Sequence, residues 1–427
     1  MKIENIEAVD EVVYSDVLPN GLTVFIIPKK GYSKTYATFT TKYGSIDRKF
    51  VPHRQARPMT VPDGIAHFLE HKLFESEAGD IMDVFSEQSA SVNAFTSATR
   101  TSYLFSATEQ IEQNIETLLD FVQEPYFTEE TVEKEKGIIA QEIQMYEDSA
   151  DWRLYLGALE GLYEKHPVRI DIAGTIDSIQ EITAEHLYTC YETFYHPSNM
   201  VFCVVGAVEP ERVMEQIRNN QEKKVFDKAT TIERFIPEET EEAYIPYRAE
   251  KMDVMKPKVN IARKVIEVDV QGRDYLRLHL AMSIGLDALF GTSSSFFEKQ
   301  YESGVIDESF GYHFTLERSF GFVSISSDTY EEEAFIQAVE ETLDELSIDR
   351  EEVERLIRRR TGQFIRALNS PEFIANQFTH YTFMKANVFD TLEVLSELTL
   401  EDIQRALMYI QPKERQAIFA IHEEDEK

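Results

Sequence analysis

The sequence predicts an α+β fold of two related domains, each an antiparallel-rich sheet packed with helices. Three observations support this prediction. A chain of 427 residues exceeds one ordinary hydrophobic core and suits two domains of roughly 200 residues. Residues 12–45 alternate apolar and polar side chains as strands do, whereas residues 109–163 follow the periodicity of helices. The order of strands and helices in the second half then repeats that of the first.

The first strands flank a hairpin signal. Asn20-Gly21 separates the strand-like residues 12–14 and 22–27, and Asn-Gly favours a tight hairpin turn. A third strand is expected at 35–43. The polar loop 47–63 then leads to a helix, so a helical layer should cover the sheet.

The remaining elements are expected in chain order. The first half continues with a helix at 80–88, strands at 91–97 and 102–107, helices through 109–163 broken by Pro125, a helix at 184–195, a strand at 200–206 and a helix from 209. The second half should contain strands at 259–268, 309–314, 321–327 and 415–421, with helices after the first strand and four helices before the last.

The boundary between the two domains is expected at the stretch 221–258. This stretch carries prolines and the acidic run 238–242, and no periodicity is sustained in it, which is typical of an interdomain connection. Residues 1–220 and 259–427 are the two predicted domains, and only the first contains the motif described next.

The motif His67-Phe-Leu-Glu70-His71 predicts a metal centre. On an α-helix, His67 and His71 fall on one face, where both imidazoles can reach a single ion. Two histidines and a carboxylate are a common zinc-binding set that leaves a position for water, and a nearby base must then take the proton. Glu70 lies beside the histidine pair and is the candidate base. The order is inverted relative to the commoner His-Glu-x-x-His motif.

A third ligand is expected from the helix predicted at 128–147, which begins at a threonine cap followed by acidic residues. Glu135 and Glu142 are seven residues apart and therefore share one face, beside Ile138 and Ile139. Carboxylates on an apolar face are unexpected without a cation. One of the two can bind the metal while the other supports it.

Several stretches together resemble the pitrilysin family of inverted zinc metallopeptidases, which includes insulin-degrading enzyme and the mitochondrial processing peptidase. They are His67 to His71, the Glu135/Glu142 pair, Ser91-Val-Asn-Ala-Phe-Thr-Ser97 with Thr101-Ser-Tyr103, His166-Pro167, Ala173-Gly-Thr175, and Tyr195-His-Pro-Ser-Asn-Met200. The resemblance implies one Zn²⁺ per chain, held by His67, His71 and Glu142, with Glu70 as catalytic base and Glu135 supporting the ligands. The separation of His71 and Glu142 is a little shorter than is usual in the family, which makes Glu147 a weaker rival as the third ligand. It also implies that the two domains form half of a clamshell peptidase chamber.

The resemblance implies a mode of substrate binding as well. In the family, the strand that matches 91–97 holds a peptide by adding it to the edge of the sheet. Asn93, Ala94 and Phe95 are therefore the candidate substrate-binding residues. The implied activity is endopeptidase cleavage of peptides or unfolded polypeptides.

One departure from the family concerns its partners. Many members supply an arginine and a tyrosine, seven residues apart, from the metal-free half to polarise the scissile carbonyl. Alignment on Gly304 places Glu298 and Val305 there, and neither can do this work. Tyr301 or Tyr312 substitutes, or a related metal-free subunit provides the donors in a heterodimer. A self-sufficient homodimer and a non-catalytic scaffold are the alternatives.

Charge and composition exclude other classes of function. The net charge of −34 argues against binding to nucleic acid or to anionic membranes. The first residues contain no signal-like apolar core, and the apolar run 200–208 is too short to span a bilayer, so a cytoplasmic location is expected. Cys190 and Cys203 are expected to be reduced core residues.

Overall fold

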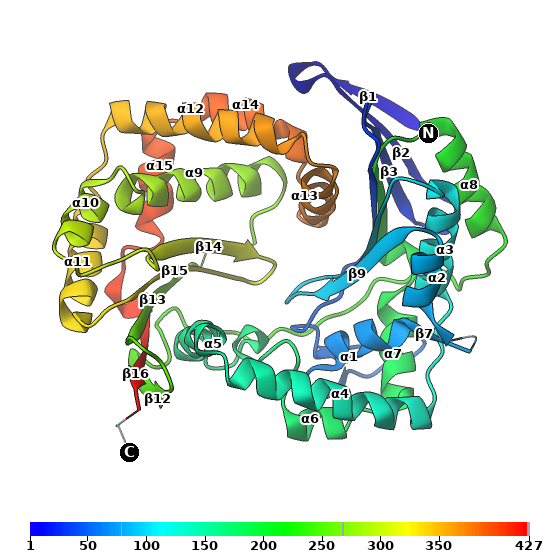
Figure 1. Ribbon diagram of the computed structural model, residues 1–427, viewed down its shortest axis with the longest axis horizontal. Helices are drawn as coiled ribbons and strands as arrows, with labels where there is room; N and C mark the ends of the chain where they lie inside the picture. The colour runs from blue at the N-terminus through cyan, green and yellow to red at the C-terminus, as the bar shows by residue number, and fades with distance from the viewer. Residues whose placement is uncertain (78, 267–268, 425–427) are drawn as a thin grey trace. The chain divides into compact units, whose positions relative to one another are not determined.

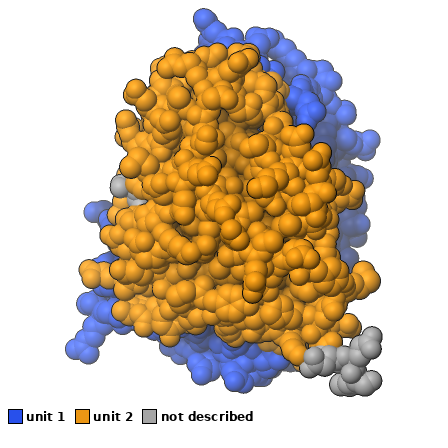
Figure 2. Space-filling view, turned by 90° about the vertical axis from the view of Figure 1, so that its left-hand side faces the viewer, with its two compact units in different colours: residues 1–143, 171–236, 365–383 blue, residues 144–170, 237–364, 384–427 orange. Residues whose placement is uncertain are grey.

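The computed structural model describes residues 1–77, 79–266 and 269–424. The chain forms two compact units, each assembled from separate stretches of sequence (Figure 2). Unit 1 comprises residues 1–143, 171–236 and 365–383, and unit 2 comprises residues 144–170, 237–364 and 384–427. The boundaries of these compact units differ from the sequence boundary predicted at 221–258. The division of the sequence into domains 1–220 and 259–427 stays a prediction.

Unit 1 contains a seven-stranded sheet in the order β1-β2-β3-β11-β4-β10-β9 (Figure 1). Its strands are β1 (Lys2–Ile6), β2 (Glu11–Val17), β3 (Thr23–Pro28), β4 (Thr35–Thr41), β9 (Ala90–Thr96), β10 (Thr101–Ala107) and β11 (Met200–Gly206). β3 and β11 run parallel, and the other neighbours are antiparallel. The hairpin predicted at Asn20-Gly21 is confirmed, because β2 and β3 pair and Gly21 adopts a φ of +92° there.

Unit 2 repeats this arrangement with five strands in the order β12-β16-β13-β15-β14. They are β12 (Tyr247–Met252), β13 (Lys258–Lys264), β14 (Gly311–Glu317), β15 (Phe320–Asp328) and β16 (Gln416–Glu423). β12 and β16 are parallel, as β3 and β11 are in unit 1. β16, the last strand of unit 2 in sequence, lies between β12 and β13, just as β11 lies between β3 and β4 in the series β3-β11-β4-β10-β9 of unit 1. The shared topology confirms the predicted α+β fold with two related halves.

The sequence analysis misses β1 and β12. Both lie at sheet edges and leave most of their side chains exposed, so neither produces the alternation that a half-buried strand shows. β12 lies within the stretch interpreted as an irregular connection. The strand expected at 259–268 ends earlier, at Lys264, and residues 267–268 lie outside the described residues.

Helices cover both faces of the first sheet. Those assigned wholly or mainly to unit 1 are α1 (Ile65–Leu73), α2 (Ile81–Glu87), α3 (Ile111–Gln123), α4 (Glu129–Glu147), α6 (Ile176–Gln180), α7 (Ala184–Phe194), α8 (Pro210–Glu222) and α13 (Pro371–Phe383). Ala37 and Phe39 of β4 face a core shared with α1, α3, α4, α7 and α8. Tyr36 and Thr38 alternate with them and contact α13 on the opposite face.

The helices of unit 2 are α5 (Ala150–Leu162), α9 (Gly272–Phe290), α10 (Ser295–Glu302), α11 (Glu332–Glu345), α12 (Arg350–Ala367), α14 (Thr391–Glu397) and α15 (Leu400–Met408). With α13, the described residues between β15 and β16 therefore form five helices, where four were expected. The stretch Gly272–Glu302 is long and apolar enough to be compared with a membrane span. Its most apolar window is 61% buried in the protein, which is the behaviour of a core helix.

Short elements complete the described chain. They are the two-stranded ribbons β5 (Lys49–Phe50) with β6 (Met59–Thr60) and β7 (Glu75–Ser76) with β8 (Gly79–Asp80), and the 3-10 turns η1 (Glu7–Val9), η2 (Pro167–Arg169), η3 (Pro197–Asn199), η4 (Val388–Asp390) and η5 (Lys413–Arg415).

Each half of the sequence contributes one helix to the unit formed mainly by the other half. α13, from the second half of the sequence, lies on β4 and β11 of unit 1, where the rings of Phe378 and Phe25 are 4.6 Å apart. α5, from the first half, lies on β13 and β16, the equivalent strands of unit 2. A Cβ atom at Gly157 would lie 2.5 Å from the Phe419 ring, so this glycine permits the close approach of α5. The helices that cover each sheet therefore come from both halves of the sequence.

Candidate metal centre

α1 carries the two histidines and is fixed at its beginning by a close backbone contact. Gly64 precedes the helix with a φ of +85°, and a Cβ atom there would lie 2.3 Å from the carbonyl oxygen of Ala173. Glycine is therefore required at this position by both conformation and space. The apolar side chains of the helix, including Phe68 and Leu69, are fully buried in the core of unit 1, which turns the histidines toward α4.

α4 carries the two candidate carboxylates. Thr128 caps the helix as expected, since its hydroxyl accepts a hydrogen bond from the backbone N–H of Thr131 at 3.2 Å. The apolar face is narrower than predicted, because Ile139 is buried but Ile138 is 48% exposed. Glu135 is buried among the core residues, and Glu142 is partly buried two turns further along the same face.

His67, His71 and Glu142 converge on one point. One ligand atom from each lies within 4.8 Å of the others, and among the described residues this is the group of side chains that could hold a metal ion. The Nε2 atoms of His67 and His71 are each 3.6 Å from a different oxygen of Glu142. This distance is too long for a hydrogen bond, but it approaches the roughly 3.3 Å between ligands of a tetrahedral ion with bonds of about 2 Å. The donor set therefore fits zinc.

Glu135 fixes the orientation of His71. Its Oε1 atom accepts a hydrogen bond from Nδ1 of His71 at 3.0 Å, so Nε2 carries the lone pair that faces Glu142. Burial alone would lower the pKa of His71. The hydrogen bond to Glu135 and the surrounding carboxylates outweigh burial and raise the pKa. By contrast, the buried Nδ1 atom of His67 has no hydrogen-bond partner in the described part of the chain.

Glu70 lies next to this group on α1 and is 8% exposed. Its Oε2 atom accepts a hydrogen bond of 2.6 Å from the hydroxyl of Thr96, the last residue of β9. The sequence analysis placed Thr96 in a strand but assigned it no role. No local pattern links residues 70 and 96, because their contact depends on how α1 lies against β9.

The candidate substrate residues lie where a peptide strand could be added. β9 is at the edge of the seven-stranded sheet and pairs on one side with β10, with Asn93 opposite Leu104 and Phe95 opposite Ser102. The other side of β9 is not paired with a strand in the described residues. Asn93 is exposed, whereas Ala94 and Phe95 are half-buried. The edge position was predicted, and the role in binding stays a prediction.

Glu147, His166 and the two cysteines take ordinary structural positions. Glu147 is exposed and is absent from the metal-binding group of the described residues. His166 is buried in unit 2, where its Nδ1 accepts a hydrogen bond from the N–H of Val168 and its Nε2 lies 3.1 Å from the hydroxyl of Ser319. Cys190 and Cys203 are buried free thiols, and burial raises both pKa values, as expected for core cysteines.

The positions expected for an arginine and a tyrosine lie in unit 2. Glu298 is on α10, and the side chain of Val305 is buried. Tyr301 is 45% exposed, whereas the hydroxyl of Tyr312 donates a hydrogen bond of 2.7 Å to Asp287. Burial and Asp287 raise the pKa of Tyr312, so this phenol stays protonated at neutral pH. Tyr312 is therefore a neutral donor whose hydroxyl proton is already directed at Asp287.

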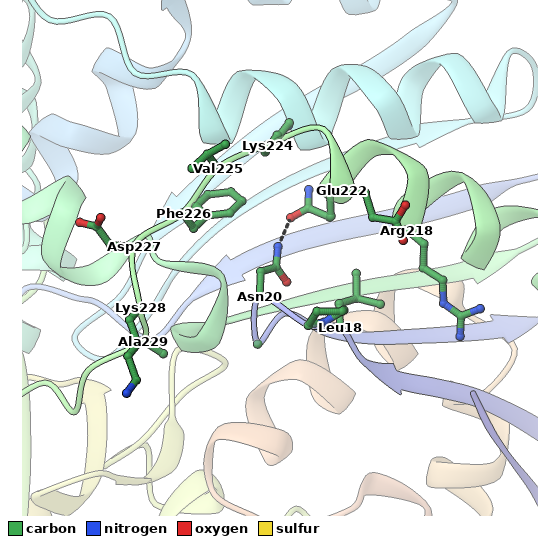
Figure 3. Close-up of a pocket in the computed structure, with 13 residues that line it drawn as sticks. Leu18, Asn20, Arg218, Glu222, Lys224, Val225, Phe226, Asp227, Lys228 and Ala229 are labelled. Carbon is green, nitrogen blue, oxygen red and sulfur yellow. Dashed lines mark hydrogen bonds between the residues drawn. The ribbon is translucent and has the colours of Figure 1, made fainter.

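A separate pocket of about 730 Å³ lies between the turn of the first hairpin and the segment after α8 (Figure 3). Asn20 lies in this pocket and donates a hydrogen bond to Gln221, while Phe226 and Lys228 line it from the segment after α8. None of the candidate metal, base or substrate residues lines it. The chemistry expected from the sequence is therefore located elsewhere in unit 1.

Comparisons with known proteins agree with this geometry. The model of the insulinase family of peptidases, M16, matches residues 60–176, and that of the M16 inactive domain matches residues 181–360. A Bacillus subtilis protein named uncharacterized zinc protease YmfH is 51% identical over 404 residues, which are 94% of each chain. The crystal structure of an M16-like peptidase from Alicyclobacillus acidocaldarius is 35% identical, covers 99% of both chains and superposes with a TM-score of 0.92.

A more distant structure shares the fold. A protease from Helicobacter pylori is 20% identical and covers 96% of this chain and 99% of its own, with a TM-score of 0.83. The resemblance inferred from the motifs is thus confirmed by relatives that span nearly the whole chain. The chain belongs to the M16 family of peptidases.

Proposed function

We propose that this protein is a zinc-dependent endopeptidase that cleaves peptides or unfolded polypeptides. The observation that carries the proposal is the convergence of His67, His71 and Glu142 on one point, with Glu70 beside them on α1. The naming of related proteins as zinc proteases supports the choice of metal. We assign His67, His71 and Glu142 as ligands, Glu70 as base and Glu135 as the residue that orients His71.

The proposed mechanism divides the work among these residues. When bound, zinc supplies a Lewis acid that lowers the pKa of water and polarises a carbonyl group. Glu70 takes the proton from the attacking water and passes it to the leaving amine. Glu135 holds His71 in the tautomer whose Nε2 can bind metal. The free edge of β9 would hold the peptide through backbone hydrogen bonds, which require no particular substrate sequence.

Replacing Glu142 provides the test of the metal site. Glu142→Ala is expected to lose stoichiometric zinc and with it peptide cleavage, because only two of the three protein ligands, the histidines, would remain. Glu147→Ala is the matched control, since Glu147 lies on the same helix but is exposed. Zinc content is measured by atomic absorption, and cleavage is measured with a quenched fluorescent peptide. Full zinc retention by Glu142→Ala, or loss in Glu147→Ala, would contradict the ligand assignment.

We further propose that the protein acts as the zinc-bearing subunit of a heterodimer with a related, metal-free chain. Support comes from Glu298 and Val305, which cannot donate hydrogen bonds to a substrate carbonyl at the positions where many relatives have arginine and tyrosine. Tyr301 and Tyr312 are the donors that this chain itself could offer.

Mixing distinguishes the proposed assemblies. Cleavage by the purified zinc-loaded chain is expected to be weak and to rise by about tenfold or more on addition of a related chain that carries the arginine and tyrosine, because these residues would stabilise the developing oxyanion. Equal rates with and without that chain would favour a self-sufficient homodimer. If the zinc-loaded chain binds a partner but cleaves no peptide in any mixture, the non-catalytic scaffold is favoured instead.

A further inference from the structure

The side chain of Glu70 forms a hydrogen bond with a residue on another secondary-structure element. Glu70 is on α1, whereas the hydroxyl that donates to its Oε2 atom belongs to Thr96 of β9. At 2.6 Å this is a short hydrogen bond to a carboxylate, and Glu70 is 8% exposed. Hydrogen bonds to charged groups in buried sites are among the stronger ones in proteins. A carboxylate can only accept, so the donor must be Thr96.

We propose that Thr96 is the positioning residue that fixes the catalytic base from the substrate-binding strand. This inference rests on the proposed peptidase function, in which Glu70 must keep one carboxylate oxygen directed at the attacking water. A glutamate side chain has three rotatable bonds, and the hydrogen bond at Oε2 selects among its rotamers and leaves Oε1 for the proton transfer.

Thr96 is itself well placed to act as a fixed donor. As a β-branched residue it has few side-chain rotamers, and its backbone pairs with Thr101 of β10. The hydroxyl of Thr101 donates to the carbonyl of Tyr43 at 2.9 Å, and Thr101 is fully buried. The donor to Glu70 is therefore attached to a strand pair that is anchored in the core.

This arrangement links substrate binding to the base. β9 contains Asn93, Ala94 and Phe95, the residues proposed to hold the peptide, and Thr96 follows them directly. A peptide added to the free edge of β9 would order the strand that also holds Glu70. The base and the scissile bond would thus be positioned by a single element, and displacing β9 would disturb both.

Two variants test the role of the hydroxyl in the zinc-loaded protein. Thr96→Val keeps the shape and the β-branch but removes the donor, and Thr96→Ser keeps the donor. We expect Thr96→Val to lower kcat by about 10–100-fold with KM changed by less than about twofold, because orientation of the base matters after substrate binds. Thr96→Ser should retain kcat within about threefold, and both variants should keep full zinc.

A second measurement does not depend on activity. Equilibrium unfolding of metal-free protein is compared for Thr96→Val, Glu70→Ala and the double variant. If the hydroxyl binds the carboxylate, Thr96→Val should reduce the folding equilibrium constant about tenfold in the wild type and much less when Glu70 is already absent.

The outcomes distinguish a failure of the proposed role of Thr96 from a failure of the proposed peptidase function. If the wild type cleaves no peptide either alone or mixed with the related chain, the proposed function fails, and the unfolding comparison alone decides whether Thr96 holds Glu70. Additive unfolding effects would overturn the inference, as would unchanged kcat in Thr96→Val. A kcat loss that Thr96→Ser does not restore would also overturn it, because the effect would then come from the strand and not from the hydroxyl.

Discussion

Glu70→Gln is expected to abolish peptide cleavage and leave the zinc content unchanged. The amide has nearly the same shape as the carboxylate, and its oxygen can still accept the hydrogen bond from Thr96. It cannot take a proton from water, so kcat should fall by about 10²–10⁴-fold, the range that general acid–base catalysis contributes. Zinc content and single-turnover cleavage of a fluorescent peptide are measured on the same preparation.

The control for this variant is Glu129→Gln. It makes the same chemical change at an exposed acid in the first turn of α4, and activity should stay within about twofold of the wild type, since exposed substitutions remote from the site rarely matter. Zinc loss in Glu70→Gln would show that Glu70 is a ligand and not the base. Undiminished cleavage would show that another residue moves the proton.

Separation of the two halves of the sequence is expected to abolish folding. In a fragment of residues 1–236, the face of the sheet that carries Phe25 and Thr38 would lose the cover of α13. Fully burying one large apolar side chain stabilises by about 1.5–3 kcal/mol. The buried residues of α13 include Ile374 and Phe378, so the lost burial approaches the roughly 5–15 kcal/mol by which whole domains are stable.

Circular dichroism and urea titration of the fragment provide the measurement. We expect no cooperative unfolding transition from residues 1–236 alone, and partial recovery when residues 365–383 are joined to them by a flexible linker. The same linker followed by a scrambled version of 365–383 is the control. A cooperative transition in the unextended fragment would mean that α13 is dispensable for the fold of unit 1.

The features that the sequence determined are those encoded by residues close together in the chain. His67 and His71 share a helix face because of their four-residue spacing, and Asn20-Gly21 forms the expected turn between its two strands. The threonine cap of α4 is another such case, because the donor and acceptor are three residues apart. The family resemblance also rested on short motifs, and relatives along nearly the whole chain confirm it.

The features that only the tertiary structure decided involve residues far apart in sequence. Both Glu142 and Glu147 are on α4, and only the packing of that helix against α1 brings Glu142 to the histidines. The contact between Thr96 and Glu70 likewise depends on where β9 crosses α1.

The exchange of α5 and α13 follows the same rule. Each has an apolar face that its own periodicity reveals, but periodicity does not state which sheet that face will cover. The hydrophobic effect is non-directional, so the sheet against which each helix packs depends on how well the two whole surfaces fit. The contact of Gly157 with the ring of Phe419 is an example of such a fit. The sequence by itself therefore determined which helices exist and what chemistry the metal helix offers, whereas tertiary packing decided which distant residues complete the site.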